Sequence, residues 1–385
     1  LPEALSNGRC SLKPAEERLC LACEMTIGDN GKVQRSRFVA ALMKSAARLT
    51  YDQVADYFEN GVLKHHDKAK GVKRNLADLH GLYKALRLAR EKRGAIDFES
   101  TEYGFQFDQR GAVAGLVLRE RNDAHKLIEE CMITANVEAA RFLLKKDKPA
   151  PYRVHAPPPE AKLEAFAQFL REQGLKVPWR ETPQPRDFEN VVLQAQGRPD
   201  EHLVMAVMLR SQSLAAYQPG NEGHFGLALK AYAHFTSPIR RYPDLLVHRA
   251  IHALLQGGGG YPYNDDSMSE LCARCSHNSR RAEEAERDVI DRLKCAYLET
   301  RIGEEFEGMV SGVTSFGLFV ELDYGQISGL VHVTGLPNDY YHFDPVSHRM
   351  KGERTGRVFQ LADRVKVRVM AVNLDERKID FELVE

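Results

Sequence analysis

The feature that most limits the fold of this chain is a change of hydrophobic pattern near residue 300. A helical pattern from about His277 to Thr300 gives way to short segments in which apolar and polar residues alternate, as is typical of strands. Gly and Asp turns separate five such segments: Phe306–Val313, Gly317–Leu322, Gly329–Val333, Arg364–Val372 and Lys378–Leu383. Five short strands with a long excursion between the third and the fourth predict a small OB-type β-barrel.

The residues before this barrel mix helical and strand patterns, which predicts an α+β body. We expect a strand-rich opening to about Gly31 and a hairpin over Ala95–Val117. Helices are expected over Ser36–Arg48, Asp52–Phe58, a longer segment that ends near Gly94, Asn122–Lys145 and Glu160–Gln173. The proline-rich stretch Pro149–Pro159 is expected to be a connector, and the glycine-rich stretch Gln256–Pro262 a loop.

The composition is that of an ordinary globular protein, with 43% hydrophobic and 28% charged residues. Lys plus Arg and Asp plus Glu both number 54, so net charge does not indicate a nucleic-acid partner, although a local channel could still concentrate positive potential. We find no secretory signal and no apolar run long enough to span a bilayer. Together with an odd number of cysteines, this favours a reducing cytoplasm.

Two Cys-x-x-Cys pairs, Cys20 with Cys23 and Cys272 with Cys275, have the spacing of zinc ligands. The first pair lies in a strand pattern, where side chains three residues apart point to opposite faces. The second pair lies in a helical stretch and has no partner pair. We therefore expect buried free thiols, and a zinc site is the less favoured alternative.

The segment from Gly223 to Asp244 contains the strongest local signal for an anion site. Phe225 to His234 alternates like a strand, and Thr236 or Ser237 before Pro238 resembles the start of a helix. Arg240 would then lie in the first helical turn, where free backbone amides and the guanidinium together suit a phosphate. Asp244 would cap a second helix. A plain surface arginine is the competing interpretation.

The run from His234 to Asp244 resembles the signature of the ribonuclease II and ribonuclease R family, whose catalytic body is the RNB domain. The resemblance covers essentially the whole chain and is closer to ribonuclease R. It implies that residues 1–300 belong to an RNB domain and residues 301–385 to an OB-fold domain of the type found in ribosomal protein S1. It also implies a processive 3'-to-5' exoribonuclease that releases nucleoside 5'-monophosphates by metal-dependent hydrolysis.

The resemblance assigns four positions in the RNB body. Arg240 would contact the scissile phosphate and act in catalysis, and Tyr51 and Glu129 would bind the sugar of the terminal nucleotides. Phe98 would stack on the last base, although a strand phenylalanine is more often part of a core. On a helical wheel, Glu129 borders the apolar face of the helix over 122–145 and Glu130 points nearly the opposite way.

In the barrel, Phe316, Phe319 and His332 match the positions at which the family stacks bases. Core packing is the alternative for either phenylalanine, and the pattern leaves the exposure of His332 open. Lys366 and Arg368 are expected to face solvent, as phosphate contacts or as ordinary charged surface. The expected partner is the 3' end of single-stranded RNA.

The resemblance implies a Mg²⁺ cofactor, but the sequence offers no convincing set of ligands. Asp265 and Asp266 fit turn chemistry, and the carboxylates between Glu283 and Asp288 alternate with arginines as on a solvated face. In the family, the metal-binding aspartates precede the segment with which this chain begins. We therefore expect the RNB domain to be incomplete at its N-terminus and no metal ligands within residues 1–385.

On this interpretation the chain alone is inactive, and the missing segment belongs to a longer native chain or to a second polypeptide. The first residue, leucine instead of methionine, agrees with a chain that begins inside a larger protein. The alternative is a non-catalytic RNA-binding adaptor that lacks a metal site. A zinc-dependent nucleic-acid module is a third and weaker alternative.

Overall fold

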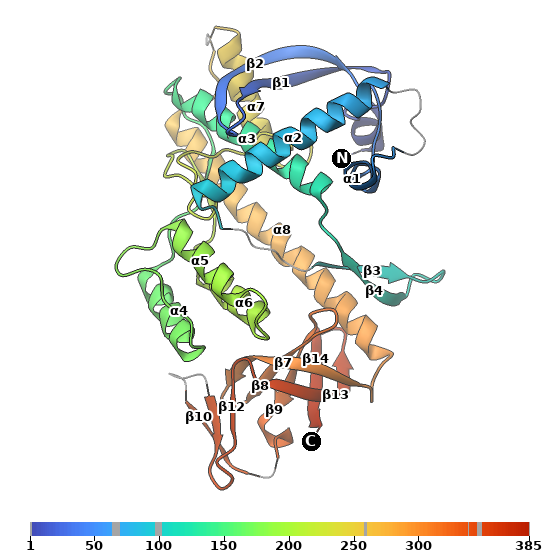
Figure 1. The fold of residues 1–385 in the computed structure, drawn as a ribbon, viewed down its shortest axis with the longest axis vertical. Coiled ribbons are helices and arrows are strands. Elements are labelled where there is room, and N and C mark those ends of the chain that lie inside the picture. Colours follow the sequence, from blue (N-terminus) through green and yellow to red (C-terminus); the bar gives the residue numbers. More distant parts are fainter. Residues whose placement is uncertain are drawn as a thin grey trace. The chain divides into compact units, whose positions relative to one another are not determined.

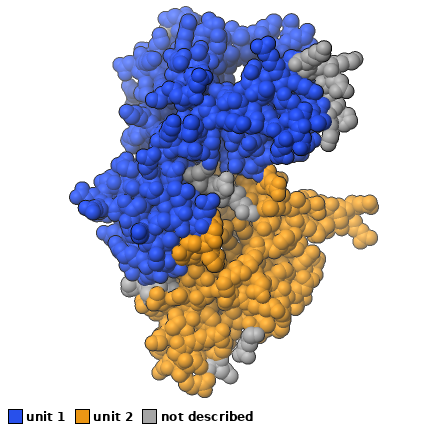
Figure 2. Space-filling model, in the orientation of Figure 1, with its two compact units in different colours: residues 1–98, 121–196, 207–278 blue, residues 99–120, 197–206, 279–385 orange. Residues whose placement is uncertain are grey.

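The structure is a computed structural model that describes residues 2–63, 70–96, 102–257, 260–337, 339–344 and 349–384. The chain divides into two compact units, drawn in different colours in Figure 2. Unit 1 comprises residues 1–98, 121–196 and 207–278, and unit 2 comprises residues 99–120, 197–206 and 279–385. The prediction of domains at 1–300 and 301–385 remains a prediction.

Unit 1 opens with a π-helix, η1 (Ala4–Arg9), and a long antiparallel hairpin of β1 (Glu17–Ile27) and β2 (Val33–Lys44) (Figure 1). The strand-rich opening is confirmed, but the helix expected over 36–48 is wrong. Residues 33–44 pair with β1 along their whole length, and Phe38 of β2 is buried against Phe142 and Phe235. Pairing and burial outweigh the helix propensity of this Ala- and Leu-rich stretch.

Three helices of unit 1 agree with the sequence pattern. They are α1 (Tyr51–Asn60), α2 (Lys70–Arg93) and α3 (Asp123–Leu144). A capping box between Thr50 and Gln53 starts α1, and the Asn122 side chain caps α3 by accepting from the His125 amide. The C-terminal half of α3 is buried in a core that includes Ala139, Ala140 and Leu143.

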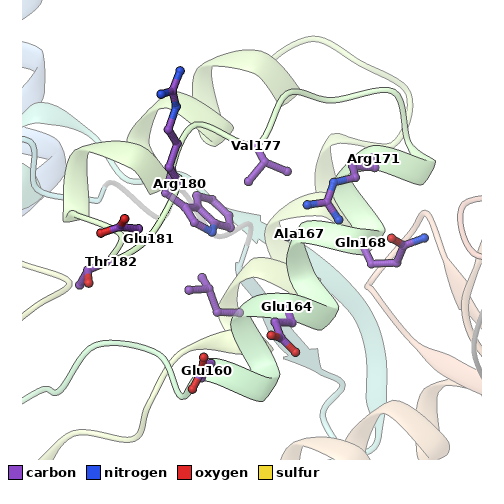
Figure 3. Close-up of a pocket in the computed structure, with 11 residues that line it drawn as sticks. Glu160, Glu164, Ala167, Gln168, Arg171, Val177, Arg180, Glu181 and Thr182 are labelled. Carbon is purple, nitrogen blue, oxygen red and sulfur yellow. The ribbon is translucent and has the colours of Figure 1, made fainter.

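Further helices follow along the chain: α4 (Glu160–Glu172), α5 (Pro185–Ala195), α6 (Glu201–Ser211), α7 (Tyr242–Leu255) and α8 (Asp265–Glu299). Two short strands, β5 (Tyr152–Val154) and β6 (Ala216–Gln218), pair antiparallel. The rings of Phe166, Trp179 and Phe188 stack beside α4, with centroids 5.4 to 6.1 Å apart. A cavity of about 770 Å³ lies between α4 and residues 177–182, with Trp179 among its lining residues (Figure 3).

Residues 225–240 differ from the prediction. Phe225–His234 is not a strand but a series of turns with isolated bridges at His224, and Arg240 lies in a single turn before α7 instead of inside a helix. The pattern misleads because this stretch folds back on itself: the Ala228 amide donates to the Phe225 carbonyl oxygen, and His224 and Leu229 exchange backbone hydrogen bonds. Asp244 lies inside the first turn of α7.

Unit 2 contains the hairpin of β3 (Glu102–Phe107) and β4 (Val113–Arg119), as predicted, and a closed barrel in the order β13-β14-β9-β8-β7. The five predicted strands are confirmed as β7 (Glu305–Thr314), β8 (Gly317–Leu322), β9 (Ser328–His332), β13 (Arg364–Asn373) and β14 (Lys378–Val384). Their inward residues, such as Leu318, Val320 and Val331, form the core. A Cβ atom on Gly317 would lie 2.2 Å from the Val331 carbonyl oxygen, so this turn requires glycine.

The excursion between the third and fourth barrel strands forms a 3₁₀ turn, η2 (Val333–Gly335), and a three-stranded sheet of β10 (Tyr341–Asp344), β11 (Arg349–Gly352) and β12 (Val358–Gln360). Among the described residues, no helix has the length and apolar character needed to cross a membrane.

Candidate nucleic-acid interface

Arg240 is exposed at the end of one helical turn that precedes α7. The amides of Arg240 and Arg241 both donate to the Ser237 carbonyl oxygen, at 3.2 and 3.0 Å. Within the described parts of the chain, no side chain or carbonyl is hydrogen-bonded or ion-paired to the Arg240 guanidinium. This guanidinium is therefore available to an anion from solvent.

Two buried side chains fix the backbone of this turn. Asp244, with none of its surface exposed, accepts from the Ser237 amide at 2.7 Å and from Arg241 Nη2 at 2.8 Å. Asn136 of α3 is 2% exposed, and its Oδ1 accepts from the amides of Phe235 and Thr236 at 2.8 and 3.2 Å. The turn is thus held from both sides by side-chain acceptors.

Positive charge gathers around His234, just before this turn. Burial, together with the nearby charges of Arg241, Arg153 and Arg240, lowers the pKa of His234 to about 2. The ring is therefore neutral at physiological pH, and its Nδ1 lies 2.8 Å from the Tyr217 hydroxyl. Of these three guanidinium groups, Arg241 is ion-paired with Asp244, so Arg153 and Arg240 provide the positive potential that favours an anion here.

Of the two predicted sugar-binding residues, Tyr51 contacts His125, and Glu129 lies on the same helix as His125. The rings of Tyr51 and His125 stack with centroids 3.8 Å apart, and His125 precedes Glu129 by one turn on the same face of α3. The His125 ring is held by a 2.7 Å contact between its Nδ1 and Asn122 Oδ1. His125 was not predicted, although its spacing of four residues from Glu129 was a usable signal.

The two adjacent glutamates of α3 lie differently from the wheel prediction. Glu130 is the buried one, and its Oε1 lies 3.0 Å from Nη1 of the equally buried Arg90. Glu129 is partly exposed, forms an ion pair with Arg121, and lies 3.6 Å from Arg90. The helical wheel did not predict that Glu130 is buried, because α2 packs against a side of α3 that lies outside the apolar stripe and brings Arg90 to Glu130. The Glu129 carboxylate is held in place and remains accessible.

The predicted stacking residues of the barrel lie on its outer side. Phe316, 47% exposed, and Phe319 meet edge to face with ring centroids 6.0 Å apart. Phe319 points away from the core between the inward Leu318 and Val320, and His332 is exposed on the neighbouring strand, opposite Gly317. Neither phenylalanine is a buried core residue, so both offer a flat side chain to solvent.

Other predicted positions contribute less. Lys366 and Arg368 face solvent, but both are paired with Glu305. Phe98 lies outside the described residues. Cys272 and Cys275 are buried in an apolar cluster as expected, and burial raises the pKa of the Cys272 thiol to about 12, so the thiol stays protonated.

No magnesium site is formed by the residues that the structure describes, because no three His, Cys, Asp or Glu side chains gather there. Asp265 and Asp266 lie in the first turn of α8, where their charge suits the helix dipole. Glu283 accepts from the Ser279 hydroxyl on the same helix. The carboxylates of the described residues therefore do not form a set of ligands for a hard divalent cation.

Comparison with known families agrees with this arrangement. Residues 1–257 match the family model of the RNB domain, and residues 299–383 match that of the S1 RNA binding domain. Ribonuclease R of Vibrio cholerae is 49% identical over 396 residues, which cover all of this chain and 48% of the relative. Ribonuclease R of Escherichia coli is 49% identical over 394 residues, with the same coverage.

The fold also matches solved structures. Mycoplasma genitalium RNase R in complex with ribose methylated single-stranded RNA superimposes with a TM-score of 0.93 at 26% identity, over all of this chain and 60% of that protein. The chain spans about half the length of the curated relatives that it matches. The fold, an α+β body followed by a five-stranded barrel, agrees with the matches to the RNB and S1 models and with the similarity over the full chain. The chain therefore belongs to the RNB family, in the ribonuclease R group that combines an RNB domain with an S1 domain.

Proposed function

We propose that this chain is the RNA-binding portion of a 3'-to-5' exoribonuclease. The observation that carries the proposal is the exposed Arg240 guanidinium on a turn held by Asn136 and Asp244, with Arg153 and Arg241 close by. Family membership supports an exoribonuclease, and the related Mycoplasma protein was solved with single-stranded RNA. The partner of this chain is accordingly the 3' end of single-stranded RNA.

Arg240 contacts the scissile phosphate in this proposal. A guanidinium can donate two parallel hydrogen bonds to phosphate oxygens, and it stabilises the negative charge that develops as the phosphodiester breaks. Because the backbone of its turn is fixed, little reorganisation is needed when the phosphate arrives. Arg153 adds positive potential without being fully exposed itself.

Tyr51 and Glu129 bind the sugar. A carboxylate accepts the hydrogen of a ribose 2'-hydroxyl, which DNA lacks, so Glu129 is suited to select RNA. The ion pair with Arg121 orients the Glu129 carboxylate, and the stack on His125 orients Tyr51. Phe98 is proposed to stack on the last base, and Phe316, Phe319 and His332 stack unpaired bases further along the strand.

Hydrolysis in this family typically requires magnesium, which would activate water and stabilise the leaving oxygen. From the family resemblance we propose that most of its ligands lie outside residues 1–385. Among the described residues, no three potential ligands gather in one place. The seven cysteines, all free, support action in the reducing cytoplasm.

Incubation of residues 1–385 with magnesium and uniformly labelled single-stranded RNA tests whether this chain binds RNA without cleaving it. We expect RNA binding in a mobility-shift assay and no release of mononucleotides. Robust release of mononucleotides would place the metal ligands inside this chain and refute that part of the proposal. Failure of the chain to bind RNA at low salt would refute its proposed role in RNA binding.

A further inference from the structure

We propose that Asn136 is a positioning residue that sets the place of Arg240 relative to Glu129. The inference rests on the proposed function, because it assumes that Arg240 holds a phosphate and Glu129 a sugar. Nothing in the sequence pattern singles out Asn136, which is an asparagine in the apolar half of a helix. Its side chain nevertheless hydrogen-bonds α3 to the segment that leads into the Arg240 turn, through Tyr232, Phe235 and Thr236.

The Asn136 side chain is hydrogen-bonded through both its oxygen and its nitrogen. Its Oδ1 accepts from two successive amides, those of Phe235 and Thr236, and its Nδ2 donates to the Tyr232 hydroxyl at 3.0 Å. The side chain is buried, so water cannot replace these bonds at low cost. The backbone at 235–236 can therefore shift only if both amides lose their acceptor.

The geometry of α3 gives these bonds a functional consequence. His125, Glu129 and Asn136 are separated by four and seven residues, which places all three on one face of the helix. At 1.5 Å per residue, Glu129 and Asn136 lie about 10 Å apart along the axis. One rigid helix thus carries the sugar-binding carboxylate at one level and the anchor of the phosphate-binding turn two turns further on.

Asp244 anchors the other end of the turn, through the Ser237 amide, but it lies on α7 and has no link to Glu129. Asn136 joins the segment before the Arg240 turn to α3, the helix that also carries Glu129. A residue that only stabilised the fold would change affinity through the population of folded protein. A positioning residue changes the number of phosphates that the folded protein neutralises.

The salt dependence of RNA binding measures that number directly. For single-stranded nucleic acid, the slope of log K against log salt falls by about 0.7 for each phosphate contact that is lost. The full chain and its variants are titrated with an oligouridylate over a range of KCl concentrations. Arg240→Ala is expected to lower the slope by about 0.7 and the affinity roughly tenfold.

Asn136→Ala is expected to reproduce the change in slope seen for Arg240→Ala, and to cause no further change when combined with it. Asn136→Asp keeps the acceptor for both amides, and the Tyr232 hydroxyl can turn to donate to it, so this variant should retain the wild-type slope. Asn136→Ser, whose hydroxyl cannot reach both amides, substitutes for Asn136→Ala if the alanine variant does not fold. Tyr232→Phe and Val191→Ala, a buried residue of α5, are the controls and should retain the wild-type slope.

The inference is overturned if Arg240→Ala lowers the slope and the folded Asn136→Ala or Asn136→Ser variant does not. It is also overturned if the effects of Arg240→Ala and Asn136→Ala on the slope add. A wild-type slope in Arg240→Ala itself would instead refute the phosphate contact in the proposed function, so the two failures are distinct.

Discussion

At the scale of single residues, the exposure of a candidate side chain was easier to predict than the contacts around it. Arg240 was predicted to be available to a phosphate, and it is exposed. The local sequence could not reveal that the Ser237 amide bonds to Asp244, seven residues later, or that Asn136 holds Phe235 across 99 positions of sequence. Bonds over such separations are decided by packing, which a local pattern does not contain.

His234 makes the stability of the fold sensitive to acid. Its pKa is about 2 in the folded chain and about 6.5 when unfolded, so below pH 6.5 the unfolded state binds more protons and stability falls as the pH falls. A His234→Gln variant keeps a partner for Tyr217 without titrating. Between pH 6 and 4, the free energy of unfolding of the wild type should fall by about 1.4 kcal/mol per pH unit more than that of the variant. Urea unfolding at each pH checks this, and parallel curves would contradict it.

At the scale of elements, regular alternation predicted the barrel well. All five strands appear where inward and outward residues alternate, because each strand has one face in the core. The same reasoning failed for β2, where small apolar residues also suit a helix, and pairing with β1 decided the outcome. The range of the helix α3 was predicted, but its contacts with α2 were not, and these determine which glutamate is buried.

The phenylalanines on the outer side of the barrel are predicted to bind RNA by stacking on its bases. Phe316→Ala and Phe319→Ala should each weaken binding of single-stranded RNA by about 1 to 3 kcal/mol, since each removes a stacking surface. Neither ring is buried in the core, so the melting temperature should change little. Phe107→Ala, which removes a phenylalanine that is 54% exposed on β3, is the matched control. Fluorescence anisotropy with a labelled oligonucleotide gives the affinities, and equal losses in all three variants would refute a specific stacking role.

At the scale of the whole molecule, the family could be recognised from the sequence because one signature and one barrel pattern occur in the right order. The matches to an RNB domain over residues 1–257 and an S1 domain over 299–383 agree with that order. The extent of the active protein could not be predicted in the same way, because residues 1–385 correspond to about half of the curated relatives. The stacking role of Phe98 likewise stays a prediction, as this residue lies outside the described part of the chain.

The central claim, that this chain grips the sugar and phosphate at the 3' end of RNA, is tested most directly by the affinity ratio of two oligonucleotides. One is RNA, and the other differs only in 2'-deoxyribose at its 3'-terminal nucleotides. We predict that the full chain binds the RNA about tenfold more tightly, that Glu129→Ala brings the ratio close to one, and that Glu59→Ala, at an exposed glutamate of α1, leaves it unchanged. Equal affinities of the unmodified chain for both oligonucleotides would contradict the account.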